Sequence, residues 1–579
     1  VALYNKKIAE IFGEIADMLD LEGENRSFEA RAYRNAARTI SSLQVDVSEI
    51  LKKSGVEGIM ELPGIGKTIA ERIKEYVETG KIAKYNELKK KYPIDFAALT
   101  KIQGLGSKKA FKLYKELGIR NVDDLRKAVE THKIRELEDF GEKSEENIAK
   151  GLEFFAMSQS RIPLGIALPE AESIIRRLLE SKLVSRAVIA GSTRRMRETV
   201  GDLDILVTSN RNEEVMDFVT KLPEVENIVV KGPTKTTVGL KIGITCDVRV
   251  VSDESFGSAL QYFTGSKEHG IAVRQIAIKN GYKLSEYGLF DKHNKNVVAG
   301  QGEEAIYKTL GMDYIPPEMR EARGEIALAL KHNLPKLVEA AEIRGDLHIH
   351  TTFSDGANTI DEMVEKAISL GMEYIGFSDH TKSEYVAHGM DGKQFAKYFA
   401  ELEKAEKKYE GQIKILKSGE VDILKDGSLD LDRRTLELMD YRICAIHTQR
   451  NMPRSEMTSR IVKALESGYA DILAHPSDRL INERAALNID FDKVFEVAKE
   501  NNVAMEINAQ PSRLDLNDEN IMKAKEYGLK FEIGTDSHHT SDMEFMRYGI
   551  GTARRGWLTK GEIINTLDYK QLLKLFEKK

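Results

Sequence analysis

The sequence predicts a multidomain protein of the α + α/β class, with an all-helical first region and two later regions of mixed structure. Three observations support this fold class. The chain of 579 residues is too long for a single hydrophobic core. Apolar residues recur with the 3.6-residue period of helices up to about residue 155, and in short β-branched runs from about 160. From about residue 342, seven strand-like runs alternate with helical segments.

Composition and charge indicate an ordinary soluble protein with one basic segment. Hydrophobic residues make up 41% and charged residues 31% of the chain, and the formal net charge is −6. Between Lys81 and Arg120, however, eleven Lys and Arg stand against three acidic residues. The two cysteines, Cys246 and Cys444, give no disulfide framework and indicate a reducing compartment. Without a signal-peptide segment or an 18-residue apolar run, we expect a cytoplasmic monomer with no membrane contact.

The helical region, residues 1 to about 155, contains short glycine loops that repeat about 40 residues apart. They are residues 62–68 (Leu-Pro-Gly-Ile-Gly-Lys-Thr) and 102–108 (Ile-Gln-Gly-Leu-Gly-Ser-Lys). A Gly-x-Gly turn at a helix start leaves backbone N–H groups free to bind a phosphate oxygen without reading a base. The residues predicted to bind DNA in this way are Gly64, Gly66, Lys67, Gly104, Gly106, Ser107 and Lys108. A weaker third copy, residues 137–143, is also explained by an ordinary turn between helices.

The middle region, residues 160 to about 310, reads as an α/β or α+β unit. Strand-like runs are predicted at residues 184–190, 204–207, 228–230, 237–242 and 246–251, with a helix at 169–179. Asp202 and Asp204 alternate on one strand, so both carboxylates face the same side, and Asp247 lies on a later strand able to pair alongside. Three converging carboxylates would hold two Mg²⁺ ions for in-line phosphoryl transfer.

A second motif precedes these acids. Gly191 and Ser192 open a tight turn whose N–H groups and hydroxyl can bind a triphosphate, and Arg195 supplies positive charge. Gly201 stands directly before the acidic strand. For an isolated Asp-x-Asp the simpler explanation is a pair of solvated surface acids. The Gly-Ser turn and the third acid in an apolar strand favour a catalytic site instead.

The last region begins after a connector. Residues 318–342 are predicted to be helical, broken at Pro335, and to pack against a domain through one apolar face. The seven strand-like runs beyond it are residues 346–350, 374–378, 413–420, 441–447, 472–475, 503–507 and 531–535. This rhythm predicts a barrel of parallel strands with helices outside.

Nine candidate metal ligands follow the ends of these runs. They are His348, His350, Asp355, His380, Glu420, His447, His475, Asp536 and His538. The chain has only 12 His, and six of them fall at these strand ends, so chance scatter is a poor explanation. Imidazole and carboxylate ligands at this density suit borderline divalent ions such as Zn²⁺ or Mn²⁺.

The middle motifs resemble the nucleotidyltransferase superfamily, and residues 262–266 (Tyr-Phe-Thr-Gly-Ser) narrow the resemblance to family X DNA polymerases. The resemblance implies a nucleotidyltransferase palm with a fingers-like subdomain, in which Tyr262, Phe263, Gly265 and Arg274 contact the incoming nucleotide and the template side. Many members of that family have an Asn that hydrogen-bonds the incoming base, and the resemblance implies that Gly270 takes its place in this chain.

The first 75 residues resemble the lyase domain of the same polymerases, and the glycine loops resemble helix-hairpin-helix motifs. Family members with lyase activity have a Schiff-base lysine at the position of Arg72. Since a guanidinium stays protonated, we expect Arg72 to bind a 5′-phosphate rather than form an imine, with Lys67 as the remaining candidate nucleophile.

The nine ligands resemble those of the polymerase and histidinol phosphatase (PHP) domain, a family of metal-dependent phosphoesterases with a distorted (β/α)7 barrel. The resemblance implies up to three ions, Mn²⁺ or Zn²⁺. His348, His350, Glu420 and Asp536 would hold the first ion, Glu420, His447 and His475 the second, and Asp355, His380 and His538 the third.

Together these resemblances predict a family X DNA polymerase with a C-terminal PHP domain, acting on gapped or nicked DNA and dNTPs. It would fill short gaps in DNA repair, with a 3′–5′ exonuclease or related phosphoesterase activity, including abasic sites or 3′-phosphates. Two alternatives remain open, a small-molecule phosphatase fused to a DNA-binding arm and a non-catalytic scaffold that binds DNA ends. The predicted domains are residues 1–80 (lyase-like), 81–155 (helix-hairpin-helix), 156–316 (palm and fingers-like subdomain), 317–341 (connector) and 342–579 (PHP).

Overall fold

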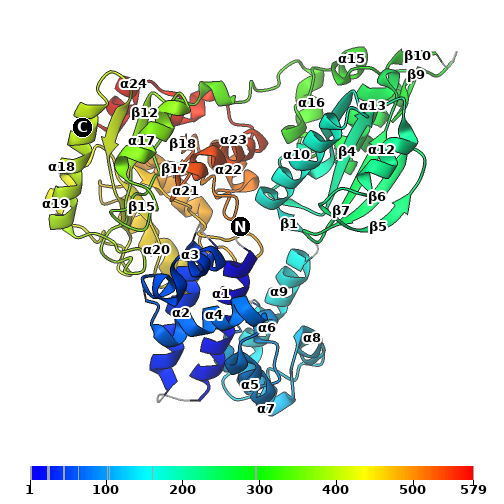
Figure 1. Cartoon of the computed structure of the whole chain (residues 1–579). Helices are drawn as coiled ribbons and strands as arrows, with labels where there is room; N and C mark the ends of the chain where they lie inside the picture. Colours follow the sequence, from blue (N-terminus) through cyan, green and yellow to red (C-terminus); the bar gives the residue numbers. More distant parts are fainter. Residues whose placement is uncertain are drawn as a thin grey trace. The chain divides into compact units, whose positions relative to one another are not determined.

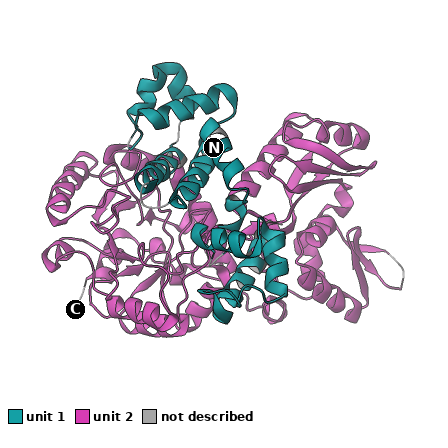
Figure 2. Cartoon of the chain, turned by 90° about the horizontal axis from the view of Figure 1, so that it is seen from below, with its two compact units in different colours: residues 1–159 teal, residues 160–579 magenta. Residues whose placement is uncertain are grey.

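The computed structural model describes residues 3–22, 26–43, 46–62, 64–100, 102, 105–159, 161–293 and 296–577. Contacts divide the chain into two compact units, Val1–Gln159 and Ser160–Lys579 (Figures 1 and 2). Within the described part of the chain, no helix combines the length and the apolar character needed to cross a bilayer.

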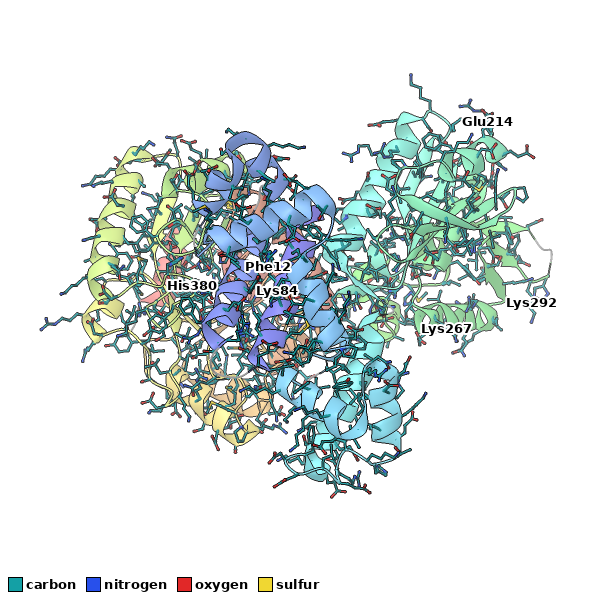
Figure 3. The ribbon with its side chains drawn as sticks, turned by 60° about the horizontal axis from the view of Figure 1, so that its bottom comes forward. Phe12, Lys84, Glu214, Lys267, Lys292 and His380 are labelled. Carbon is teal, nitrogen blue, oxygen red and sulfur yellow. The ribbon has the colours of Figure 1, made fainter. Side chains whose placement is uncertain are left out.

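The first unit, called the helical unit below, consists of short packed helices, as the apolar period predicts. Its helices are α1 (Leu3–Asp20), α2 (Ser27–Ser42), α3 (Val47–Met60), α4 (Lys67–Thr79), α5 (Ala83–Lys91), α6 (Phe96–Leu99), α7 (Ser107–Leu117), α8 (Val122–Glu130) and α9 (Gly141–Gln159). The core contains Ile8, Phe12 and Ile15 of α1, which are spaced by three or four residues and fully buried. Phe12 is labelled among these helices in Figure 3.

The second unit begins with a mixed five-stranded sheet, here called the sheet domain (residues 161–251). Its strand order is β2-β4-β7-β6-β5, and only β4 and β7 run parallel. These strands are β2 (Arg186–Ile189), β4 (Asp202–Thr208), β5 (Val225–Lys231), β6 (Lys235–Leu240) and β7 (Thr245–Val250). They coincide with the predicted runs. The helix predicted at residues 169–179 begins earlier in the structure, because α10 (Leu164–Glu180) continues through Pro169.

A small-sheet subdomain (residues 252–321) follows the sheet domain. Its strands β8 (Tyr282–Ser285), β9 (Gly288–Asp291) and β10 (Val297–Ala299) form an antiparallel sheet. Its helices are α13 (Phe256–Thr264), α14 (Lys267–Lys279) and α15 (Glu303–Thr309). Its core also contains Met319 and Leu337, so the start of the connector packs against this subdomain.

The helical prediction for the connector is largely wrong. The only α-helix of this segment is α16 (Glu325–Leu330), flanked by the short turns η3 (Pro317–Met319) and η4 (Ala340–Glu342). Beyond Pro335, Leu337 forms a β-bridge with Thr559. Pro335 has no N–H to donate, so the apolar residues that follow it are buried on an extended chain rather than on a helix face. The predicted packing against a domain does occur.

The C-terminal domain (residues 342–577) contains short parallel strands with helices between them. One sheet has the order β11-β12-β13 and the other β14-β15-β16-β17-β18. The strands are β11 (Gly345–Asp346), β12 (Tyr374–Phe377), β13 (Lys414–Lys417), β14 (Glu420–Asp422), β15 (Ile443–Ala445), β16 (Ile472–Leu473), β17 (Ala504–Glu506) and β18 (Phe531–Glu532). The intervening helices include α17 (Ile360–Ser369), α18 (Gly392–Lys408), α20 (Arg454–Leu465), α21 (Phe491–Glu500), α22 (Asp518–Glu526) and α23 (Met546–Arg555).

Two single bridges join these sheets, His380 to Glu420 and Ile349 to Ser537. The predicted run at residues 413–420 therefore corresponds to two strands, because the chain breaks at Ser418-Gly419 and leaves one sheet for the other. A Cβ atom at Gly419 would lie 2.9 Å from the side chains of Met439 and Phe395, which explains the glycine at this break.

Candidate active sites and DNA-binding loops

The three acids predicted for nucleotidyl transfer lie on the two parallel strands of the sheet domain. Asp202 and Asp204 belong to β4, and Asp204 pairs in register with Asp247 of β7. Burial, followed by the charges of Asp202 and Asp247, raises the pKa of Asp204 to about 7. The carboxylates therefore repel one another, and a cation between them would stabilise all three.

Neighbouring polar groups already hold one of these acids. Asp247 accepts a hydrogen bond from the hydroxyl of Thr237, and its other oxygen lies 2.7 Å from the amine of Lys235. Burial acts to raise the pKa of Asp247, but the hydrogen bonds from Lys235 and Thr237 outweigh it and lower the pKa. Among the described residues, the ligand groups with all atoms within 4.8 Å of one another belong to the C-terminal domain, so the three acids of the sheet domain are more widely spaced.

The Gly-Ser motif packs directly on this acidic cluster. Gly191 has φ +61°, and a Cβ atom there would lie 2.4 Å from Oδ2 of Asp204. Both the backbone conformation and the close approach therefore require glycine. Gly191 begins α11 (Gly191–Arg194), and the hydroxyl of Ser192 is buried with no hydrogen-bond partner among the described residues. An unpartnered buried hydroxyl beside the acids fits a contact with a phosphate oxygen. Gly201 directly precedes β4.

The remaining predicted nucleotide contacts lie around the junction of α13 and α14. The rings of Tyr262 and Phe263 pack edge to face with centroids 5.0 Å apart, and the guanidinium of Arg274 lies 5.6 Å from the Tyr262 ring. Gly265 has φ +67° at the end of α13. A Cβ atom at Gly270 would lie 3.9 Å from Arg274, which is an ordinary van der Waals contact, so packing does not require glycine at this position.

Arg195 is held by protein groups from two elements. Its Nε donates to Glu321 at 3.0 Å, and its Nη1 donates to the carbonyl oxygen of Thr264. Burial is the largest influence on this guanidinium and lowers its pKa. Two of its three nitrogens are thus engaged within the protein, and its contact with a triphosphate stays a prediction.

The structure brings all nine predicted metal ligands into the C-terminal domain's strand-end region. Six of them follow a strand: His348 after β11, His380 after β12, His447 after β15, His475 after β16, and Asp536 and His538 after β18. His350 lies beside the single bridge at Ile349, and Asp355 lies in the loop after β11. Glu420 is the first residue of β14, which comes shortly after β13. The expected strand over residues 346–350 is shorter than predicted, because β11 ends at Asp346. His348 and His350 consequently lie on the extended segment beyond the strand.

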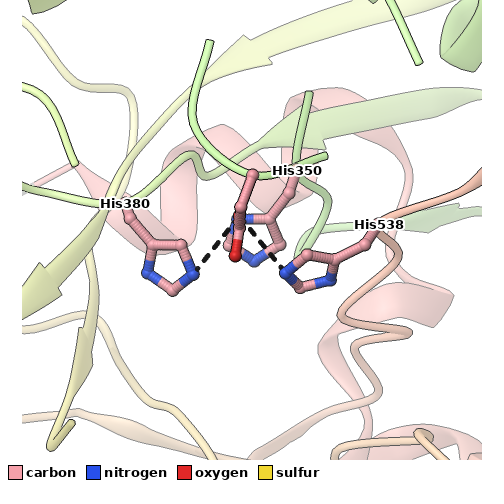
Figure 4. Close-up of side chains that lie close together, drawn as sticks. His350, His380 and His538 are labelled. Atoms are coloured by element: carbon pink, nitrogen blue, oxygen red, sulfur yellow. Dashed lines mark ion pairs between the residues drawn. The ribbon is translucent and has the colours of Figure 1, made fainter. Parts of the chain in front are cut away.

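These ligands form overlapping groups. The groups are His350, Asp355, His380 and His538; His348, His350 and Asp536; and His380, Glu420 and His447. In the first group, Oδ1 of Asp355 lies 3.7 Å from Nε2 of His380 and 3.4 Å from Nε2 of His538 (Figure 4). His350 and His380 are each shared between two groups, which differs from the predicted allocation to three ions. That allocation stays a prediction.

Glu420 lies at the centre of the site. Its Oε1 is 3.1 Å from Nε2 of His447 and 2.8 Å from Nε2 of His475, and its Oε2 is 3.0 Å from Nδ1 of His380. Burial acts to raise the pKa of Glu420, but His447 and His380 hold it well below its ordinary value. A fully ionised carboxylate with imidazoles on both oxygens can bridge two cations.

The donor set fits divalent metal ions. Buried imidazole nitrogens that form no hydrogen bond with any described residue include Nε2 of His348 and both ring nitrogens of His350. Unpartnered buried nitrogens are rare unless a ligand uses them. Burial lowers the pKa of His380 to about 3, which keeps the ring neutral, the form that binds a metal.

Carboxylates behind the imidazoles complete the site, and the sequence analysis missed them. Oε1 of Glu506 lies 2.5 Å from Nδ1 of His348, and Oδ1 of Asp422 lies 3.3 Å from Nδ1 of His447. Such partners fix the ring orientation of metal-binding histidines. Glu506 stands between Met505 and Ile507 in a buried strand, and an acid inside an apolar run is a signal that could have identified it.

In the helical unit, the described residues that lead into α4 and α7 have similar conformations in the two glycine loops. Gly66 precedes α4 with φ −85° and ψ 171°, and Gly106 precedes α7 with φ −77° and ψ 169°. In both, the residue before this glycine donates to a carbonyl three residues earlier, at 3.1 and 3.0 Å, and no side chain of a described residue caps the helix. The first N–H groups of both helices are therefore available to a phosphate.

The lysines predicted to assist these loops, Lys67 and Lys108, are exposed, and Ser107 is half-buried. Gly64 has φ +72°, whereas Gly104 lies outside the described residues. The weaker third loop differs from the first two, because α9 begins at its glycine, Gly141.

Arg72 projects from α4 and is paired. Its Nη1 lies 2.8 Å from Glu75, and this hydrogen bond raises the pKa of Arg72 above its ordinary value. A more strongly protonated guanidinium is further from imine chemistry and better suited to binding an anion.

Comparison with known families matches four parts of the chain. Residues 3–82 match a helix-hairpin-helix domain and residues 96–153 a SAM-like helix-hairpin-helix tandem. Residues 259–321 match the DNA polymerase beta thumb, and residues 346–510 match the PHP domain. The predicted helix-hairpin-helix and PHP regions are confirmed, and the subdomain described above as fingers-like is matched as a thumb.

Similar proteins cover the whole chain or its parts. The DNA polymerase/3′-5′ exonuclease PolX of Bacillus subtilis (strain 168) is 37% identical over 98% of this chain and 99% of its own length. DNA polymerase lambda of Arabidopsis thaliana is 26% identical over 55% of this chain and 62% of its own length. A probable phosphatase of Thermoanaerobacter sp. (strain X514) is 31% identical over 38% of this chain and 89% of its own length.

Proposed function

The chain belongs to the PolX family, the family X DNA polymerases with a C-terminal PHP domain, and on that premise we propose that it both extends and shortens DNA 3′ ends during gap repair. The observation that carries the proposal is the presence of two separate ligand clusters in one compact unit. One consists of carboxylates beside a Gly-Ser turn, and the other of imidazoles and carboxylates. Its substrates would be dNTPs and gapped or nicked DNA.

For synthesis, Asp202, Asp204 and Asp247 would hold two Mg²⁺ ions. When bound, these ions lower the pKa of the primer 3′-hydroxyl and neutralise charge on the triphosphate. The N–H groups at Gly191 and the hydroxyl of Ser192 would orient the triphosphate for in-line attack. The close approach of Gly191 to Asp204 couples the position of the nucleotide to that of the ions.

For hydrolysis, the nine ligands of the C-terminal domain would hold Mn²⁺ or Zn²⁺, which polarise the phosphodiester and activate water. Glu506 and Asp422 would hold the imidazoles in position through their second ring nitrogens. The reaction would release nucleotides from a 3′ end.

The helical unit would bind the gap through its two glycine loops, with Arg72 on the 5′-phosphate. We propose that it lacks imine-forming lyase activity at position 72. Trapping a 5′-deoxyribose phosphate substrate with borohydride tests this, because a covalent product lost in a Lys67→Ala variant would assign the chemistry to Lys67 instead.

The test of the two activities is a double dissection on a 5′-phosphorylated gapped duplex with Mg²⁺ or Mn²⁺. The double variant Asp202→Ala/Asp204→Ala should lose primer extension and keep primer shortening, whereas His348→Ala should do the reverse. Glu214→Ala removes an exposed acid on α12 (Asn212–Val219), labelled in Figure 3, and should change neither activity. Survival of both activities in both site variants would refute the assignment.

A second activity, removal of terminal phosphates, is favoured by the similarity of the C-terminal domain to a probable phosphatase. Release of phosphate from a 3′-phosphorylated primer, lost in His348→Ala, would support it. Turnover of free phosphomonoesters with no activity on DNA would instead favour a small-molecule phosphatase.

A further inference from the structure

Three arginine side chains converge on one buried carboxylate of the C-terminal domain. Nη2 of Arg484 lies 2.6 Å and Nη1 of Arg513 3.0 Å from Oδ1 of Asp478, and Arg450 pairs with its other oxygen. The side chain of Asp478 is 1% exposed, whereas those of the arginines are 18% to 31% exposed. The carboxylate is therefore buried, whereas the three arginine side chains that surround it are partly exposed. We call these three residues the arginine cluster.

The arginine cluster borders the metal ligands at several points. Its anchor Asp478 lies 4.0 Å from Nδ1 of His475, and Nε of Arg513 lies 3.6 Å from Oδ2 of Asp536. Arg450 lines a cavity of about 460 Å³ that His447 also lines. A ligand whose reacting atom lies at the imidazoles would thus extend directly over the cluster.

The cluster carries more positive charge than its protein partners neutralise. Three guanidinium groups share Asp478, and Arg513 also lies 3.6 Å from Asp536, so three positive charges face two carboxylates among these ion pairs. Burial, and then Arg450 and Arg513, lower the pKa of Arg484 to about 10 against the opposing effect of Asp478. Mutual repulsion of this kind is relieved by a bound anion.

We propose that Arg450, Arg484 and Arg513 form a phosphate subsite that holds the phosphodiester next to the scissile one in a DNA strand. This rests on the proposed exonuclease function. Guanidinium groups suit the role, because their fork of donors matches the paired oxygens of a phosphate and their charge is permanent. A substrate with a single phosphodiester cannot occupy the subsite while it reacts.

The experiment compares two substrates with the full-length protein and Mn²⁺. One is a single-stranded oligonucleotide, and the other is bis(p-nitrophenyl) phosphate, which has one phosphodiester only. Arg450→Ala should raise KM for the oligonucleotide at least tenfold and change kcat/KM for the small diester less than twofold, and Arg450→Lys should recover part of the loss. Arg454→Ala is the matched control, because Arg454 is 58% exposed on nearby α20 and pairs only loosely with Asp490 at 3.4 Å.

Salt dependence separates phosphate binding from a structural role. Loss of one phosphate contact should reduce the slope of log KM against log salt by roughly 0.7 for a single strand. An equal loss on both substrates, or an unchanged slope, would overturn the proposal. If the wild-type protein cleaves neither substrate, the exonuclease function itself fails. Primer extension by the same preparations checks that the variants are folded.

Discussion

Replacing Arg555 by Ala should loosen the junction between the C-terminal domain and the nucleotide motif. Arg555 ends α23, and its side chain is 4% exposed. Its Nη1 donates to the carbonyl oxygen of Arg195 at 2.8 Å and to Glu321 at 2.9 Å, while its Nη2 pairs with Asp518. One guanidinium therefore joins a helix of the C-terminal domain to the turn after α11 and to the end of the small-sheet subdomain.

The expected loss of stability in Arg555→Ala depends on which partners Glu321 and Asp518 keep. Removing one member of a buried ion pair costs about 3 to 5 kcal/mol when the other is left alone. Here Glu321 keeps Arg195 at 3.0 Å, and Asp518 keeps Arg323 at 3.0 Å. We therefore expect the lower end of that range, about 3 kcal/mol, which makes local opening of this junction roughly a hundredfold more frequent. Because Arg195 follows the Gly-Ser turn, KM for dNTP should rise as well.

Native-state hydrogen exchange of the full-length protein measures this opening directly. Amides of residues 191–197 and 317–323 should exchange faster in Arg555→Ala, and those of α18 should not change. Arg547→Ala is the matched control. Arg547 lies on the same helix and also pairs across to the sheet domain, with Glu172 at 3.0 Å, but both side chains are more than 40% exposed. An exposed pair of this kind contributes about 0 to 1 kcal/mol. If both variants lost the same protection against amide exchange, the buried ion pairs of Arg555 would not stabilise this junction more than the exposed pair of Arg547 does.

Three further changes have defined outcomes. Gly191→Ala should abolish primer extension and spare primer shortening, since its Cβ would lie 2.4 Å from Asp204; both rates measured on one gapped duplex check this. Glu506→Gln should weaken Mn²⁺ binding at the C-terminal site roughly 10- to 100-fold, measured by metal titration, because His348 loses its orienting carboxylate. Burial lowers the pKa of His269 below 6.5, so the folded protein binds fewer protons than the unfolded chain. The contribution of His269 to stability is therefore present above pH 6.5 and lost as the pH falls, and calorimetry from pH 8 to 5 should show a smaller loss in His269→Gln.

The ligand cluster of the C-terminal domain was predictable because each ligand follows a recognisable apolar run. Strands of parallel sheets end on one side, so spacing along the chain translates into proximity in space. The outer carboxylates do not follow apolar runs in this way. Glu506 lies inside one, which marks it as unusual, but its partner His348 is 158 residues away. Sequence order alone does not reveal which buried acid faces which ring.

In the connector, the sequence pattern predicted the wrong secondary structure. Its apolar residues have a helical spacing, but Leu337 pairs with Thr559 as extended chain and Val338 donates to the carbonyl of Leu558 at 3.0 Å. The partner strand comes from residues more than 200 positions later, so the choice between helix and extended chain is decided by tertiary pairing. Local periodicity reports only that one face is buried.

The two sites differ in donor chemistry. The sheet domain offers only carboxylates with a hydroxyl nearby, and Asp204 needs a nearby cation to ionise fully at neutral pH, since its pKa is about 7. Oxygen ligands of this kind suit Mg²⁺. The C-terminal site instead presents imidazole rings, among them the neutral His380, around the ionised Glu420, and such ligands suit borderline ions. On the proposed assignment of the ions, one compact unit would supply synthesis and hydrolysis with separate metals.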